Sequence, residues 1–194
     1  MEKTWVDQFH ENGNHDFFIR VNPEFLGDES VKNSLRCHFP EIDMLIDYIC
    51  GRIERNDPHI DRMATRLYYA VHSYYLETDE GLEKVYSMFL AKKFPLCPRY
   101  LCKGTQCLPT GTISENNLYV LKLYCPRCKE TYNVSDSLEA CVPGDSFGEN
   151  WIRLFLAKYP EACNGNRDDN IVPRIFGFKI RNESILVNDS QRFK

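Results

Sequence analysis

Apolar residues recur at helical spacing through the first half of the chain. Ile42, Leu45 and Ile49 fall on one face of a helix, with polar residues between them. A longer apolar stripe runs from Ile60 to Tyr75, which predicts a helix of about four to five turns. The pattern therefore predicts several helices that pack on one another up to about residue 92.

Capping signals mark where these helices begin. Asn22 precedes Pro23 and Asp57 precedes Pro58, and each pair places a capping side chain before a proline at the first helical position. A further helix is expected to begin near Thr78. The apolar positions of the first and last predicted helices are Trp5, Val6 and Phe9, and Leu82, Val85 and Phe89.

The helical period ends near Phe94, where prolines, cysteines and glycines take its place. Residues 118–124 are rich in strand-forming side chains and predict a strand that runs directly into Cys125. The sequence Leu-Pro-Thr-Gly at residues 108–111 predicts a turn. The apolar residues 151–156 predict a short helix or strand.

A polar linker at residues 164–170 precedes an apolar, aromatic tail at residues 171–180. Alternation along a short strand would place Phe176, Phe178 and Ile180 on one face. Such a tail could be a terminal strand that packs on its own domain. Alternatively, two aromatic side chains presented by a stiff hairpin would suit a partner's pocket as binding anchors.

Two cysteine pairs carry the chemistry of the second half. Cys97 and Cys102 form a C-x4-C pair, Cys125 and Cys128 form a C-x2-C pair, and 22 residues separate the two pairs. This spacing is typical of a zinc ribbon, in which four thiolates hold Zn2+ in a closed, structural site. The pairs could instead be disulfides or a redox C-x-x-C site, but a redox motif would give the second pair no role.

The remaining cysteines lie outside this spacing. Cys107 is close to the first pair in the sequence and could be mistaken for a metal ligand. We expect four scattered cysteines to be small core residues: Cys37, Cys50, Cys141 and Cys163.

Composition narrows the class of protein. An apolar fraction of 43% and an aromatic fraction of 13% are sufficient for a folded core in a chain of 194 residues. A net charge of −4 weighs against duplex DNA as the main partner. The first residues show no apolar signal segment, and no apolar run is long enough to cross a bilayer, so we expect an intracellular protein without a membrane partner.

Two other functions deserve comparison with a purely structural zinc ribbon. A nucleic-acid binder would use the mildly basic ribbon surface, although its aromatic residues do not interleave with the charges as a stacking surface requires. The cations are Arg99, Lys103, Lys122, Arg127 and Lys129. An enzyme is disfavoured because the chain has no Gly-rich phosphate loop, nucleophile elbow or histidine–carboxylate metal set. His72 lies in a helical pattern and is expected to be a core or surface residue rather than a base.

Short motifs spread over most of the chain point to the same protein family. They are Trp5, Gly13-Asn14 before Phe17-Phe18, residues 43–47 and 68–75, Thr78-x-x-Gly81, both cysteine pairs, Leu108-Pro109-x-Gly111, Phe147-Gly148 and Pro160-Glu161. The most specific stretch is the tail, with Val172-Pro173-Arg174 followed by Gly177-Phe178-Lys179-Ile180. On these residues the chain resembles the regulatory (beta) subunit family of casein kinase II.

The resemblance implies a non-catalytic protein that binds Zn2+ through the four cysteines and dimerises through its ribbon. The dimer would dock two casein kinase II catalytic subunits through its tails, giving a tetramer found in nucleus and cytoplasm. It would stabilise the kinase and modulate its activity and its choice of protein substrates. The expected kinase contacts are Phe176, Phe178, Leu154 and Arg174, and the apolar residues expected at the dimer interface are Leu108, Val120 and Leu121.

These features together predict an α+β fold with an all-helical N-terminal domain, a four-cysteine zinc ribbon and an extended C-terminal docking tail. The expected boundaries are residues 1–92 for the helical domain, 93–163 for the zinc-ribbon dimerisation domain and 164–194 for the kinase-docking tail.

The chain also departs from the family pattern. Residues 1–4 lack the serine-rich acidic start that the kinase phosphorylates in the family. Residues 50–57 offset their acidic side chains with arginines where the family has a dense acidic loop, so we expect no strong anionic field and no polyamine activation. Phe176 replaces the usual tyrosine, and Arg-Asn at residues 181–182 replaces the usual His-Pro.

Overall fold

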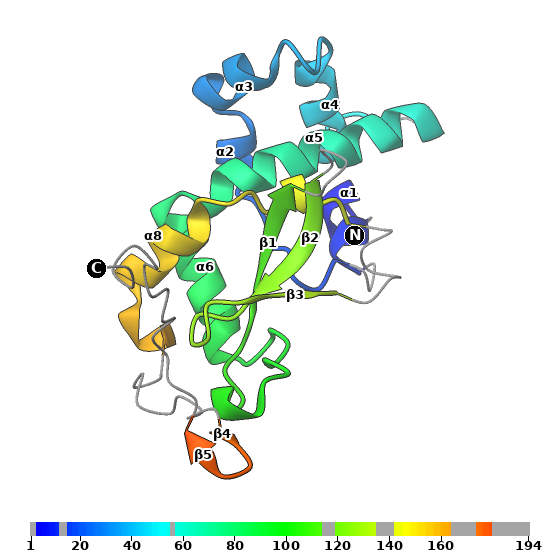
Figure 1. The fold of residues 1–194 in the computed structure, drawn as a ribbon. Coiled ribbons are helices and arrows are strands. Elements are labelled where there is room, and N and C mark those ends of the chain that lie inside the picture. Colours follow the sequence, from blue (N-terminus) through cyan, green and yellow to red (C-terminus); the bar gives the residue numbers. More distant parts are fainter. Residues whose placement is uncertain are drawn as a thin grey trace, which may run out of the picture.

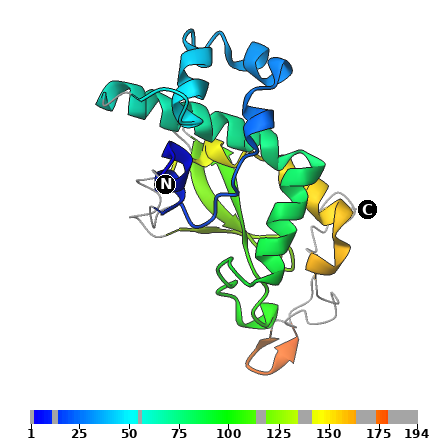
Figure 2. The ribbon, with the colours of Figure 1, turned by 180° about the vertical axis from the view of Figure 1, so that it is seen from behind.

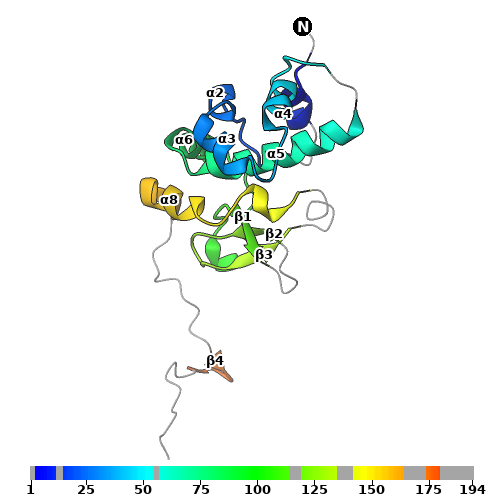
Figure 3. The ribbon, with the colours of Figure 1, turned by 90° about the horizontal axis from the view of Figure 1, so that it is seen from above.

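The chain folds into a helical layer and a layer that contains a small sheet. The computed structural model describes residues 3–11, 15–54, 57–113, 119–134, 142–163 and 174–179. Helices fill the first half of the sequence, and three antiparallel strands followed by a helix fill most of the second half (Figures 1 and 2). Figure 3 shows the two layers face to face. The predicted α+β class is confirmed.

Side-chain caps define the helical layer as the sequence predicted. Its helices are α1 (Trp5–Glu11), α2 (Pro23–Leu26), α3 (Glu29–Leu35), α4 (Ile42–Ile49), α5 (Pro58–Leu76) and α6 (Asp79–Leu90). The side chains of Asn22, Asp57 and Thr78 each accept a hydrogen bond from a backbone N–H in the first turn of the next helix. Helix α3 was not predicted, because it is short and buries only Leu35.

The sheet has the strand order β1-β2-β3, with β1 (Leu108–Ile113), β2 (Tyr119–Tyr124) and β3 (Thr131–Asn133). Strand β2 confirms the strand predicted before Cys125. The turn predicted at residues 108–111 is wrong, because these residues begin β1. Pro109 is tolerated there because β1 is an edge strand. The N–H of Gly111, two residues on, points away from β2 to the carbonyl of Gly148, so the nitrogen of Pro109 also faces the outer edge.

Shorter elements complete the chain. They are the 3-10 helices η1 (Tyr100–Cys102), η2 (Gly144–Ser146) and η3 (Pro160–Cys163), the helix α8 (Trp151–Lys158), and the hairpin of β4 (Arg174–Ile175) and β5 (Phe178–Lys179). Helix α8 shows that residues 151–156 are helical rather than extended. None of the helices within the described residues is long and apolar enough to cross a membrane.

The two layers share one continuous hydrophobic core. Phe18, which precedes α2, packs on Phe147 with ring centroids 5.0 Å apart. The backbone of η2 lies directly on the sheet, since a Cβ atom added to Gly144 would overlap the carbonyl of Val120. The core therefore has no break at residue 92, and the boundaries 1–92, 93–163 and 164–194 stay predictions.

Candidate metal centre and docking hairpin

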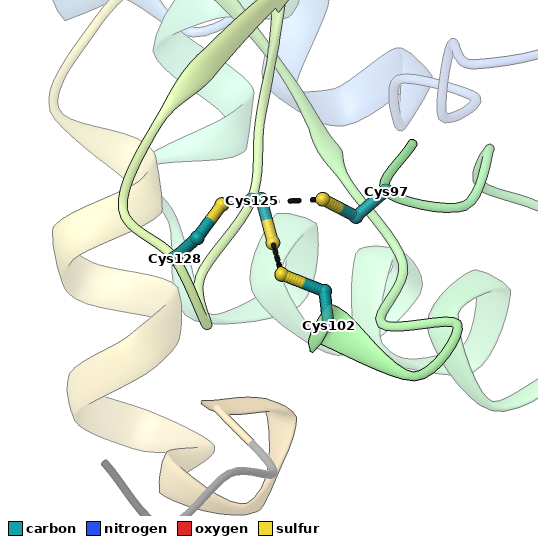
Figure 4. A group of neighbouring side chains, drawn as sticks. All are labelled: Cys97, Cys102, Cys125 and Cys128. Atoms are coloured by element: carbon teal, nitrogen blue, oxygen red, sulfur yellow. Dashed lines mark hydrogen bonds between the residues drawn. The ribbon is translucent and has the colours of Figure 1, made fainter. Parts of the chain in front are cut away.

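Four cysteine side chains converge at the end of the ribbon remote from α5. The sulfur atoms of Cys97, Cys102, Cys125 and Cys128 all lie within 4.8 Å of one another (Figure 4). The Sγ atoms of Cys102 and Cys125 are 3.8 Å apart, and those of Cys97 and Cys128 are 3.9 Å apart. The fold thus brings together the two pairs that the sequence separates by 22 residues.

Two similar turns present these cysteines. In the first turn, the N–H of Cys97 donates to the carbonyl of Thr105 at 2.8 Å, and Lys103 adopts a left-handed conformation with φ 49°. In the second, the N–H of Cys125 donates to the carbonyl of Glu130 at 2.9 Å, and Lys129 is left-handed with φ 61°. Each turn reverses the chain just after its second cysteine, which points both sulfur atoms of a pair to the same side.

The sulfur geometry fits a tetrahedral zinc site. A Zn–S bond of about 2.3 Å places the sulfur atoms of a tetrahedron about 3.8 Å apart. The two measured distances match that edge, and they are far longer than the about 2.05 Å of a disulfide bond. Four thiolates without an open position would hold the metal as a structural centre rather than as a catalyst.

Burial and hydrogen bonding change the pKa values of the cysteine thiols in opposite directions. Burial raises the pKa of the Cys102 and Cys125 thiols, so metal binding there must displace protons. Burial also raises the pKa of Cys128, but hydrogen bonds from the Tyr132 hydroxyl and the Glu130 N–H outweigh it and bring the pKa to about 7. The guanidinium of Arg127 donates to the carbonyl of Cys102 at 3.5 Å. Cationic neighbours of this kind offset the charge of the thiolates.

The other cysteines are placed differently. Cys107 is buried against the cluster but is not one of its four members. Cys37 is exposed, so the prediction that it is a core residue is wrong. Cys50 and Cys163 are half-buried, and Cys141 lies outside the described residues.

The tail hairpin is tighter than the sequence predicted. Ile175 pairs with Phe178, so Phe176 and Gly177 form a two-residue turn. Both have positive φ angles, 51° and 87°, as a type I′ turn requires. The prediction that Phe176 and Phe178 alternate along one strand is therefore wrong. Phe176 is a turn residue, and only Phe178 belongs to a strand. Phe176 is 96% exposed and Phe178 is 77% exposed. Ile180 lies outside the described residues.

The remaining predicted contact residues lie in β1 and β2, on α8 and on the hairpin. Leu108 and Leu121 are fully buried in the core of the chain itself, so neither side chain is available to a partner, and Val120 is half-buried. Leu154 on α8 is 41% exposed. Arg174 pairs with Lys179 in the backbone ladder of the hairpin. The hairpin lies apart from α8 in Figure 3.

Two further residues near the cysteines were missed by sequence reasoning. The hydroxyl of Tyr132 lies 3.2 Å from the Sγ atom of Cys128. Tyr100, inside the C-x4-C pair, is 93% exposed. The only sequence signal for either was an aromatic residue close to a cysteine.

Comparison with known proteins decides the family. The family model for the casein kinase II regulatory subunit matches residues 4–179, which is nearly the whole chain. The chain belongs to the casein kinase II regulatory subunit family. It is 29% identical to casein kinase II subunit beta of Schizosaccharomyces pombe, over 98% of this chain and 84% of that protein. It is 28% identical to subunit beta' of Saccharomyces cerevisiae, over 98% of this chain and 78% of that protein.

A third relative, casein kinase II subunit beta' of Drosophila melanogaster, is 25% identical over 92% of this chain and 84% of its own length. Membership confirms the resemblance drawn from the motifs. The family is the regulatory subunit of casein kinase II and not its catalytic kinase. The four clustered cysteines of this family member could hold a metal ion, and their geometry is consistent with zinc.

Proposed function

We propose that this chain is a non-catalytic scaffolding subunit that binds Zn2+ through Cys97, Cys102, Cys125 and Cys128. In this proposal the zinc ribbon at residues 93–163 forms a homodimer, and the tail at residues 164–194 docks a casein kinase II catalytic subunit. Two protomers would carry two kinases, stabilise them and modulate their activity and substrate choice. The family resemblance leads us to expect this role in both nucleus and cytoplasm.

The observation that carries the docking proposal is the pair of exposed rings on the hairpin. Phe176 and Phe178 leave 96% and 77% of their surface in water, which is costly for neighbouring aromatic side chains unless a partner covers them. Because the two-residue turn fixes the backbone that carries both rings, little backbone conformational entropy remains to be lost on binding. Central aromatic residues of this kind commonly dominate the binding free energy of an interface.

The proposed dimer surface lies at the cysteine end of the ribbon. Leu108 and Leu121 are occupied by the chain's own core. Leu96, at 61% exposure, precedes Cys97, and the exposed Tyr100 lies between Cys97 and Cys102. Both are apolar side chains that a second ribbon could bury. Replacing both with serine is expected to give monomers in light scattering while the chain keeps its zinc.

Calorimetric titration of the zinc-loaded chain into a casein kinase II catalytic subunit tests the proposal. We expect saturation at one kinase per chain. Absence of binding, with zinc content and dimer intact, would mean that the fold was retained while its partner changed.

A second candidate function is binding of single-stranded nucleic acid. Arg99, Lys103 and Lys129 are exposed and lie beside the cluster cysteines in the sequence, and the exposed Tyr100 follows Arg99 directly. Cations and an aromatic face are the elements of a stacking surface. Fluorescence anisotropy with a labelled oligonucleotide would favour this function if binding weakened steeply with salt. Undetectable binding at low salt would remove it.

A further inference from the structure

The cysteine cluster is not equally protected on all sides. Cys97, Cys102 and Cys125 are buried, whereas Cys128 is half-buried. A thiolate that faces solvent is more accessible than its buried neighbours to electrophiles and to competing chelators. Cys128 is therefore the ligand whose retention depends most on what surrounds it.

Tyr132 on β3 lies at this accessible edge. Its hydroxyl oxygen is 3.2 Å from the Sγ atom of Cys128. Since a metal-bound thiolate carries no proton, the phenol must donate this hydrogen bond and the sulfur must accept it. The donor comes from outside the turn that carries Cys125 and Cys128, so it can restrain the sulfur independently of that turn.

The sheet holds the phenol in place. Tyr132 pairs with Leu123 across the β2–β3 ladder, and both side chains pack against the cysteine cluster. The strand register thus determines where the hydroxyl lies relative to Cys128. At the buried Cys125, by contrast, backbone N–H groups of Arg127 and Cys128 provide the hydrogen bonds. Cys128 accepts from the Glu130 N–H and, in addition, from the Tyr132 hydroxyl, which also interacts with Cys97.

We propose that Tyr132 is a positioning residue of the metal centre, whose O–H···S hydrogen bond orients the Cys128 thiolate and slows its loss from zinc. This inference rests on the proposed binding of zinc by the four cysteines. Partners of this kind outside the ligand set typically change metal affinity about 10- to 100-fold when they are removed. If Tyr132 served only to pack on the sheet, its hydroxyl would be dispensable.

The test compares Tyr132→Phe with Tyr119→Phe in the 194-residue chain. Both substitutions remove one tyrosine hydroxyl from the same sheet, but Tyr119 begins β2, at the end of the strand remote from Cys125, and is exposed. Zinc transfer to a chromogenic chelator is expected to be about 10-fold faster for Tyr132→Phe and unchanged for Tyr119→Phe. Among the four cysteines of the cluster, mapping of limited N-ethylmaleimide labelling should show Cys128 modified first, and sooner in Tyr132→Phe. Labelling of the exposed Cys37, which lies outside the cluster, should be the same in both proteins.

A spectroscopic measurement separates positioning from packing. In the cobalt-substituted chain, the sulfur-to-metal charge-transfer band should move to longer wavelength in Tyr132→Phe, because a lost hydrogen bond raises the energy of the sulfur lone pair. A packing role alone would leave the band in place.

The outcomes distinguish this inference from the proposed metal centre. Wild-type chain that retains no zinc would overturn both. Wild-type chain that retains zinc, with unchanged zinc transfer and an unshifted cobalt band in Tyr132→Phe, would overturn the role of Tyr132 alone.

Discussion

His72 donates a hydrogen bond from its Nδ1 atom to the main-chain carbonyl of Ser146 at 2.7 Å, across the boundary between the two layers. Its Nε2 atom accepts from the N–H of Ile19 at 3.2 Å. Both ring nitrogens are thus used, which requires the neutral Nδ1–H tautomer. One buried side chain of α5 therefore connects segments that are more than 50 residues away in either direction, a role that the sequence did not reveal.

Replacing His72 with phenylalanine should destabilise the whole fold. Phenylalanine keeps an aromatic ring, somewhat larger than imidazole, but the N–H of Ile19 and the carbonyl of Ser146 lose their partner inside the core. Each buried unpaired group costs about 1–3 kcal/mol, so we expect the free energy of unfolding to fall by about 2–5 kcal/mol in urea titrations. His59→Gln, at an exposed position of the same helix, should change it by less than about 0.5 kcal/mol. Equal stability of the two variants would contradict this role.

Acid should destabilise the protein through the same side chain. Burial lowers the pKa of His72 from 6.5 to about 3. Below pH 6.5 the unfolded chain takes up a proton here while the folded chain does not, so stability is fully present above pH 6.5 and falls as the pH drops toward 3. The slope from this group approaches about 1.4 kcal/mol per pH unit. Burial also lowers the pKa of His10, to about 4, which acts in the same direction.

The pH effect can be separated from acid titration elsewhere by a second variant. The difference in unfolding free energy between wild type and His72→Gln should shrink as the pH falls from 6.5 to 4, because glutamine does not titrate. A difference that stayed constant over this range would show that His72 is not the group responsible.

Under the proposed function, removal of one cysteine of the cluster should unfold the ribbon and dissociate the homodimer. Cys125 is fully buried, and a structural zinc site contributes about 10–16 kcal/mol of binding free energy to folding in zinc-finger peptides. We expect Cys125→Ser to lose zinc in metal analysis and to become monomeric in light scattering. Cys37→Ser, which changes an exposed cysteine outside the cluster, should keep both. A dimeric Cys125→Ser protein would separate dimerisation from the metal.

Truncation of Phe178 should weaken kinase binding without affecting the fold. The side chain is exposed in the free chain, so Phe178→Ala costs no core packing. A central aromatic anchor is worth at least about 2 kcal/mol of binding free energy, measured by calorimetry against the catalytic subunit. Leu90→Ala removes a comparably exposed apolar side chain from α6 and should bind as wild type does. An unchanged dissociation constant for Phe178→Ala would refute the anchor.

Gly177 should matter through its left-handed backbone conformation. Its φ angle is 87°, and a Cβ atom there would meet nothing within 4 Å. Gly177→Ala should therefore weaken kinase binding by about 1–2 kcal/mol, the cost of placing a non-glycine residue in the left-handed region. Gly27→Ala, at φ −84°, is the matched control and should bind normally. Equal binding of Gly177→Ala would mean that the turn is not retained in the complex.

Local features could be predicted from the sequence because they depend on neighbouring residues. The caps at Asn22, Asp57 and Thr78 need only a side chain and the next turn of helix. The cysteine spacing likewise predicted that the two pairs come together, and the strand-forming residues before Cys125 predicted β2. The tail motif pointed to the family that comparison then confirmed.

Only the tertiary structure decided which apolar side chains stay exposed. Leu108 and Leu121 look like surface hydrophobics of a small ribbon, but both are fully buried in the core that the two layers share. Tyr132 reaches Cys128 only through the register of β3 on β2. Periodicity shows which residues avoid water, but not which remote segment covers them, because that choice depends on contacts between residues far apart in the chain.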